Sequence, residues 1–418
     1  MSARPAAGAR LPDTDAPPTT LPPEGPPGRR RRGVPAGAWV LLPQAVSRLS
    51  AIYVFAAAAT RADAAQLGVL AVATAVTAGA FGLAPAVVGK PLAALDDDGA
   101  RRERAPLAQS AAVLASLVAG LALGTAALLT DGSLRLTLAC AALGVPAAMV
   151  VESEYWRSVF LRGRKPAGLV LASSYLVQSA AVTVAAVWLS PTEVVLAPFA
   201  GLALSALLVL AWRGLSPRGA WAWATTYRAT WLPYVSGVAA SVVLVQAIPI
   251  VLSLTVGLAA ASVYRAGELA FGGTNLAIGV ATQTLLTQET PDPRRSYRRV
   301  GVVLAAVSLA NGLVLALVPT ALLARVIGPT APLLHDLLVL ITLQRVSFGL
   351  AVLAGVLLIP LVPARLVGLL QVVGAGLNLA LLVAGSLTLG LPGAFAGLAV
   401  AELLVALLLG RHVWKASA

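Results

Sequence analysis

The sequence contains few of the residues that form disulfides and metal centres. Its 418 residues include one cysteine, Cys140, and two histidines, His335 and His412, which lie far apart along the chain. A single cysteine excludes an intramolecular disulfide and a cysteine-based metal site. The sequence also has no clustered His, Cys and carboxylate residues and no glycine-rich phosphate-binding loop. We therefore expect no cofactor and no bound metal.

Charged residues are also scarce. Only 11% of the residues are charged and 58% are hydrophobic, whereas about a quarter of a soluble domain is charged. Apolar runs of roughly 20 residues, the length that crosses about 30 Å of hydrocarbon, recur from residue 37 to the C-terminus. The composition predicts an all-α polytopic membrane protein. The net charge of +13 would suggest nucleic acid in a soluble protein, but here we expect no nucleic-acid partner.

The chain divides into a polar tail and a series of apolar segments. Residues 1–35 are rich in Pro, Gly and Arg and are predicted to be a disordered basic cytoplasmic tail, not a secretory signal peptide. The remainder predicts about twelve transmembrane helices, near 37–59, 64–89, 107–130, 133–155, 166–188, 192–213, 231–256, 258–288, 300–325, 332–359, 364–388 and 391–411.

The distribution of basic residues predicts the orientation of these helices. One side of the predicted membrane receives all but six of the 30 Lys and Arg residues. The six are Arg61, Arg135 and Arg325 on the opposite side and Arg48, Arg265 and Arg345 within the spans. Because basic loops remain in the cytoplasm, both termini are predicted to be cytoplasmic, in a multi-pass protein of the cytoplasmic membrane.

The helix pattern repeats. The basic loop "DDDGARRER" (96–104) has a counterpart in "ETPDPRRSYRR" (289–299), and six helices accompany each. We predict an N-lobe at 36–213, an interfacial linker at 214–230 and a C-lobe at 231–418. Because each lobe has six helices, we expect the two lobes to be parallel and related by a pseudo-two-fold axis along the membrane normal. A substrate site is expected between the lobes, near the midplane of the membrane. The connections are short, so we expect no extramembrane catalytic domain and no enzyme activity.

Three arginines lie inside predicted spans. Arg48 and Arg345 are deep, and Arg265 lies closer to the outer end. A charge in hydrocarbon costs several kcal/mol, so these side chains should face protein or water. A guanidinium group engages two phosphate oxygens at once, and the arginines are therefore candidate ligands of an anionic substrate.

Uncharged polar residues accompany the arginines. Gln44 precedes Arg48 by four residues and shares its helix face. Gln344 adjoins Arg345, and Asn275 continues the polar line of the segment that carries Arg265. All three are candidate substrate-binding residues.

The same residues also fit structural roles. Arg265 and Glu268 are spaced to neutralise each other within one helix, and Arg48 and Arg345 could each be a buried hydrogen-bonding centre. Glu402 is either a partner of one of these arginines or a site for H⁺ or Na⁺, and Glu268 is a second candidate for ion coupling.

Two further carboxylates lie near the cytoplasmic end of the predicted helix at 133–155. Glu152 and Glu154 precede Arg157. We expect the three to form an ion-pair cluster at the membrane interface.

Three stretches resemble the multidrug/oligosaccharidyl-lipid/polysaccharide (MOP) flippase superfamily, particularly its polysaccharide-export (Wzx-like) branch. They are "QLGVLAVATAVTAGAFGLAPAVVGKPLAAL" (66–95), "ESEYWRSVFLRGRKPAGLVLASSYLVQ" (152–178) and "VYRAGELAFGGTNLAIGVATQTLL" (263–286). The resemblance implies a flippase that moves a polyprenyl-(pyro)phosphate-linked glycan between leaflets of the bilayer. It implies that Arg48, Arg265 and Arg345 contact phosphate and that Gln44, Asn275 and Gln344 meet sugar hydroxyls.

Other transporters and one class of enzyme remain as alternatives. A major-facilitator transporter also has two six-helix halves, and a multidrug-type exporter shares the superfamily. A membrane glycan polymerase or ligase usually needs a larger outer loop than this chain provides. The absence of two further helices argues against the lipid II branch of the superfamily.

Overall fold

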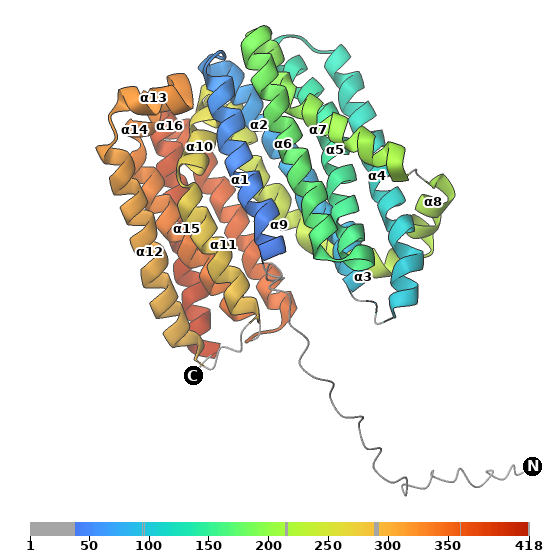
Figure 1. Ribbon diagram of the computed structural model, residues 1–418. Helices are drawn as coiled ribbons and strands as arrows, with labels where there is room; N and C mark the ends of the chain where they lie inside the picture. Colours follow the sequence, from blue (N-terminus) through green and yellow to red (C-terminus); the bar gives the residue numbers. More distant parts are fainter. Residues whose placement is uncertain are drawn as a thin grey trace, which may run out of the picture. The chain divides into compact units, whose positions relative to one another are not determined.

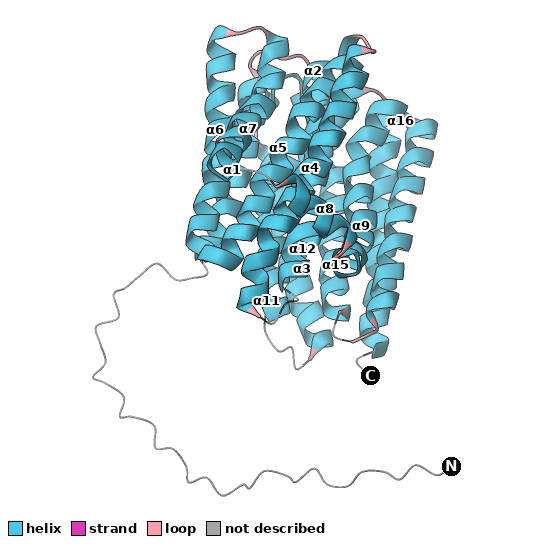
Figure 2. Ribbon diagram, turned by 90° about the vertical axis from the view of Figure 1, so that its right-hand side faces the viewer, coloured by secondary structure: helices cyan, strands magenta, loops and turns pink. Residues whose placement is uncertain are grey.

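The computed structural model describes residues 38–93, 95, 97–213, 216–287, 292–359 and 361–416. Every regular element in these ranges is helical, and Figures 1 and 2 show the helices running side by side and joined by short loops. The predicted basic tail, residues 1–35, lies outside the described residues. Nine of the described helices are long and apolar enough to cross a membrane. The chain is therefore an all-α, multi-pass membrane protein, as predicted.

The first half of the chain forms α1 (Ala38–Ala59), α2 (Ala64–Ala84), the π-helix η1 (Pro85–Gly89), α3 (Lys90–Ala93), α4 (Asp98–Leu128), α5 (Gly132–Arg162), α6 (Arg164–Trp188), α7 (Pro191–Arg213) and α8 (Pro217–Thr225). The second half forms α9 (Arg228–Thr255), α10 (Leu258–Ala270), α11 (Gly272–Thr287), α12 (Pro293–Leu317), α13 (Thr320–Ile327), the 3₁₀ helix η2 (Gly328–Thr330), α14 (Ala331–Asp336), α15 (Leu338–Leu358) and α16 (Ala364–Ala416).

The helix limits follow from residues that satisfy or remove backbone groups. Asp63 caps α2 in a reciprocal pair with Gln66, and Asp97 and Asp292 accept backbone hydrogen bonds at the starts of α4 and α12. A side-chain oxygen at this position satisfies an amide that has no partner within the helix. Gly390 has φ of 64° inside α16 and divides it into two helices.

Twelve membrane segments result. They are α1, α2, α4, α5, α6 and α7, then α9, α10 with α11, α12, α15 and the two parts of α16. The twelve predicted helices are confirmed in number and order. The predicted segment 258–288 is interrupted at Phe271, beside Gly272 and Gly273, where the sequence carries residues of low helix propensity.

Two predicted helices had incorrect limits at one end of the bundle. The segment predicted at 300–325 ends at Leu317, because Pro319 adopts an extended conformation, and α13 then forms a separate helix. Figure 1 shows α13 lying across the end of the bundle. The segment predicted at 332–359 begins as the short helix α14, and its long helix starts only at Leu338.

The arginines at helix ends identify the two ends of the bundle. We call the end at which α1 begins and α16 ends the basic end, since α5 and α7 end there with Arg162 and Arg213 and α6 begins there with Arg164. At the opposite end, α2 contacts α10 so closely that a Cβ atom at Gly68 would clash with the backbone of Leu258. Helix α2 packs against both α9 and α10 and joins the two groups of six segments. The predicted limits of the lobes and linker remain predictions.

Candidate functional site

A broken helix positions the first two charged residues of the site. Helix α10 carries Arg265 and Glu268 one turn apart, and it ends at Ala270. The side-chain amide of Asn275 donates a hydrogen bond of 3.1 Å to the carbonyl oxygen of Glu268. Asn275 thus joins the start of α11 to the last turn of α10 and fixes the backbone beneath the charged side chains.

Glu268 connects two arginines from different helices. Its Oε2 atom accepts a hydrogen bond of 3.0 Å from Arg265 Nη1, and its Oε1 atom lies 3.8 Å from Arg345 Nη2 on α15. Arg345 is buried, whereas the side chains of Arg265 and Glu268 are 23% and 25% exposed. The predicted neutralisation within α10 is therefore real, but the carboxylate is shared with a third residue.

Arg48 completes a group that we call the arginine cluster: Arg48, Arg265, Glu268 and Arg345. From α1, Arg48 interacts electrostatically with the other three members. It is exposed, and no hydrogen bond of its guanidinium group to another described residue is present. Two of the three predicted arginines thus share a carboxylate, and the third forms no ion pair with another described residue.

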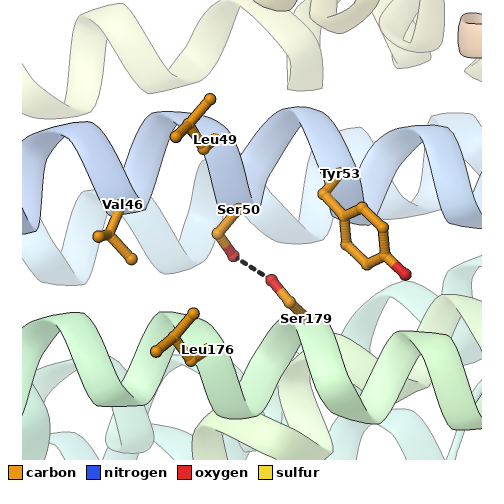
Figure 3. A pocket seen from close by; sticks show the side chains of 6 residues that line it. All are labelled: Val46, Leu49, Ser50, Tyr53, Leu176 and Ser179. Carbon is orange, nitrogen blue, oxygen red and sulfur yellow. Dashed lines mark hydrogen bonds between the residues drawn. The ribbon is translucent and has the colours of Figure 1, made fainter.

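Arg48 does not face the shallow pocket on the same helix. That pocket, of about 220 Å³, lies between α1 and α6, and the Ser50 hydroxyl is 2.8 Å from that of Ser179 within it (Figure 3). Its α1 residues, including Leu49 and Tyr53, follow a helical stripe, and Arg48 lies on the opposite side of α1 at 100° per residue. The pocket lining is almost entirely apolar, which fits a surface that faces hydrocarbon.

Glu402 lies near the cluster within the second half of the chain. It is buried on α16 and interacts with Asn378 and, electrostatically, with Arg345. Tyr264, also buried, interacts with both Glu268 and Glu402. Three arginines therefore face two carboxylates, which leaves net positive charge at the site. Arg345 Nε and Asn378 Oδ1 are buried without a hydrogen-bond partner among the described residues.

Several predicted residues are placed differently from the arginines. Gln44 is exposed one turn from Arg48, Gln344 is buried on α15, and neither amide contacts the arginine cluster in the described structure. Asn275 is near the cluster, but its amide nitrogen donates a hydrogen bond to the backbone carbonyl of Glu268. Sequence reasoning missed Tyr264 and Asn378: Tyr264 adjoins Arg265 and could have been found from that position, whereas Asn378 is a single polar residue in an apolar stretch.

Half of the predicted cluster on α5 is wrong. Glu154 is fully buried and pairs with Arg213 at 2.7 Å and with Arg157 at 3.7 Å. Glu152 has no ion pair among the described residues; it accepts a hydrogen bond of 3.1 Å from Trp156 Nε1. Residues two apart on a helix face different directions, which separates the environments of the two carboxylates. No group of three or more potential metal-ligating His, Cys, Asp or Glu side chains occurs in the described part of the chain.

Comparison with solved structures defines the fold. A multidrug-resistance MATE family transporter of the MOP superfamily in an inward-facing conformation is 13% identical, with 92% of this chain and 100% of that chain covered and a TM-score of 0.60. The lipid II flippase MurJ in an inward closed conformation is 11% identical, with 91% and 87% covered and a TM-score of 0.64. The Vibrio cholerae MATE transporter VcmN in the bent form is 14% identical, with 91% and 96% covered and a TM-score of 0.53.

No family model matches the sequence, and no curated protein matches it. The structural likenesses nonetheless define the class: the chain has the fold of membrane transporters and flippases. More particularly, it shares its fold with a MATE transporter of the MOP superfamily and with the flippase MurJ. The predicted superfamily resemblance is confirmed at the level of fold, and the polysaccharide-export branch remains a prediction.

Proposed function

We propose that this protein is a flippase that moves a polyprenyl-(pyro)phosphate-linked oligosaccharide or polysaccharide precursor across the cytoplasmic membrane by alternating access. The observation that carries the proposal is the excess of arginine over carboxylate in the arginine cluster. Its members come from α1, α10 and α15, hence from both groups of six segments. A charge-bearing site shared by two lobes can change shape when the lobes move.

The chemistry of the cluster suits a phosphate group. Guanidinium groups present several planar donors, and hydrogen bonds between charged partners are about twice as strong as neutral ones. In the proposed complex Arg48, Arg265 and Arg345 contact the (pyro)phosphate. Gln44 and Gln344, with the amide oxygen of Asn275, are proposed to meet sugar hydroxyls.

The exposure of α1 is consistent with access from the basic end. The half of α1 near that end exposes Gln44 and Arg48, whereas Phe55 and Ala58 in the other half are buried. At the far end, α1 packs against α13 and η2. We propose that the basic end is cytoplasmic and that the substrate enters the cluster from that side.

The proposed direction of transport agrees with the membrane potential. When the cell interior is negative, moving one negative charge outward releases about 2.3 kcal/mol per 100 mV of membrane potential. Glu268 and Glu402 are the candidate residues for additional coupling to H⁺ or Na⁺. Each carboxylate lies within electrostatic range of Arg345, so a change in its charge alters the charge available to the substrate.

A multidrug-type exporter is the alternative, since MATE transporters share the fold. The two proposals differ in the substrate retained when the protein is absent. Mass spectrometry of lipid extracts from cells with and without the gene should show accumulation of a polyprenyl-phosphate-linked glycan upon deletion. Retention of a soluble compound or drug, without such a lipid, would instead support the exporter.

The role of the arginines is tested in the same cells. We expect Arg48→Ala and Arg345→Ala to reduce flipping by about 10- to 100-fold, since hydrogen bonds to charged groups contribute about 1.5–3 kcal/mol. Arg135→Ala is the matched control, because Arg135 is exposed at the far end of the bundle. Full export by both cluster variants at normal protein levels would contradict the proposed function.

A further inference from the structure

Helix α5 carries two carboxylates with opposite surroundings. Glu154 accepts hydrogen bonds from Arg213 Nε at 3.0 Å and Nη2 at 2.7 Å, from Ser158 Oγ at 2.9 Å and from Gln109 Nε2 at 3.1 Å. Both oxygens of this buried carboxylate are thus occupied, and its charge is compensated. Glu154 is a structural centre that joins α4, α5 and α7.

Glu152 lacks this compensation. It is half-buried on the other side of α5, and its Oε1 atom accepts a hydrogen bond from Trp156. Its other described interactions are electrostatic ones with Tyr155 and Tyr175, neither of which carries a positive charge. An ionisable residue within a membrane segment is costly and marks a functional site when its partner is not supplied by the protein.

The surroundings of Glu152 form a rigid aromatic site. The Trp156 indole lies against Gly89 of η1, where a Cβ atom would approach the ring to 2.8 Å. Tyr155 meets this indole edge to face, with ring centroids 5.3 Å apart. The Trp156 N–H therefore holds the carboxylate in one orientation, and the Oε2 atom of Glu152 accepts no hydrogen bond from another described residue.

Tyr175 connects this carboxylate to the arginine cluster. It projects from α6 and interacts with Ser47 of α1 and, electrostatically, with both Arg48 and Glu152. Arg48 and Glu152 each lie ten residues from the basic end of their helix, and Tyr175 lies eleven residues from the start of α6. At 1.5 Å per residue, all three are about 15–17 Å from the basic end.

We propose that Glu152 and Tyr175 form a carbohydrate subsite next to the arginine cluster, in which Glu152 Oε2 accepts hydrogen bonds from hydroxyls of the sugar joined to the phosphate. A carboxylate accepts hydrogen bonds but donates none, which suits a polyol rich in O–H donors. Arg48, which interacts with the same Tyr175 as Glu152, repels a cation and favours a ligand that combines an anion with neutral donors. This inference rests on the proposed function and specifies which residues distinguish the glycan from its carrier.

The test compares two lipids that share the polyprenyl pyrophosphate and differ in the sugar, which esterifies the terminal phosphate of one of them. Purified protein in nanodiscs is titrated with polyprenyl pyrophosphate and with polyprenyl-pyrophosphoryl-N-acetylglucosamine, and dissociation constants are measured. The variant is Glu152→Gln, which keeps the side-chain size and an oxygen for the Trp156 N–H. Glu193→Gln is the control, because Glu193 is exposed at the far end and accepts hydrogen bonds from Ser190. Thermal unfolding verifies that both variants are folded.

We expect Glu152→Gln to weaken binding of the sugar-bearing lipid by about 10- to 100-fold, from the loss of charged hydrogen bonds, with binding of polyprenyl pyrophosphate unchanged. Arg48→Ala should weaken binding of both lipids. An equal effect of Glu152→Gln on the two lipids, or no effect on either, overturns the subsite while the phosphate site stands. If the unaltered protein binds neither lipid, the proposed function fails as well. A third outcome concerns the organic cation ethidium. If the unaltered protein binds ethidium but neither lipid, and Glu152→Gln abolishes ethidium binding, cation export would replace both proposals.

Discussion

Replacing Glu268 by glutamine distinguishes an arginine cluster that binds phosphate from one that only stabilises the fold. Glu268 lies 3.0 Å from Arg265 Nη1 and 3.8 Å from Arg345 Nη2, and it neutralises part of the charge that we assign to the substrate. Glutamine preserves the size of the side chain and removes the negative charge. If the cluster binds phosphate, Glu268→Gln should bind the anion more tightly even though the protein itself becomes less stable.

The size of the effect follows from Coulomb's law. A phosphate that contacts the same guanidinium groups lies roughly 6 Å from the Glu268 carboxylate, and two unit charges at that separation repel by about 2.8 kcal/mol at an effective dielectric constant of about 20. The Glu268 side chain is 25% exposed, so water weakens this repulsion. We therefore expect affinity to rise by at least about tenfold, or ~1.4 kcal/mol. The stability loss should stay below the ~3–5 kcal/mol of a fully buried pair.

The assay measures equilibrium binding of polyprenyl pyrophosphate to protein in nanodiscs, with thermal unfolding followed in parallel. Glu193→Gln again serves as the control, since it removes a carboxylate remote from the cluster. Higher affinity combined with a lower unfolding temperature supports the reasoning. Unchanged or weaker binding by a folded Glu268→Gln variant would refute it, because the carboxylate would then not compete with the ligand for the arginines.

Two further predictions concern the fold. Gly68→Ala should lower the unfolding temperature, because its Cβ atom would clash with the Leu258 backbone where α2 meets α10. The control is Gly79→Ala on the same helix, whose Cβ position has no neighbouring atom within 4 Å and which should leave the unfolding temperature unchanged or raise it. Equal effects of the two substitutions would contradict the close contact. Glu154→Gln should lower the unfolding temperature or the yield of folded protein, since removing one partner of a buried pair costs about 3–5 kcal/mol and leaves Arg213 uncompensated. A fully stable Glu154→Gln protein would show that the pair is dispensable.

Length and hydropathy were sufficient to predict the membrane segments because the thickness of the bilayer requires a similar length of apolar helix from each of them. The break near Gly272 could also be predicted, since glycine weakens a helix. The end of α12 could not, because apolar residues continue across Pro319 into α13. Hydropathy averages over many residues, whereas a single proline decides whether the backbone continues as a helix.

The individual residues of the candidate site could be predicted from the sequence, but the contacts between residues of different helices could not. Arg48, Arg265 and Arg345 were identified by the cost of a charge in hydrocarbon, and the spacing of Arg265 and Glu268 predicted their ion pair. Spacing within one helix could not reveal that Glu268 also approaches Arg345, because that contact depends on how α10 and α15 pack. The sequence position of Gln344 next to Arg345 likewise could not show whether the two side chains share a helix face, since adjacent helical residues face different directions.

The pair Glu152 and Glu154 shows why charge compensation, and not charge alone, identifies a ligand site in a membrane protein. Both carboxylates occur in the stretch "ESEYWR", and both were predicted to be ion-paired beside Arg157. The fold supplies Arg213, Ser158 and Gln109 to Glu154, so its charge has a structural explanation. Among the described residues the fold supplies only an indole N–H to Glu152, and we assign the second hydrogen-bonding partner of its carboxylate to the ligand. The same criterion applies to Arg48: unlike Arg265 and Arg345, it forms no ion pair with a carboxylate among the described residues, which is why we place the phosphate beside it and the sugar beside Glu152.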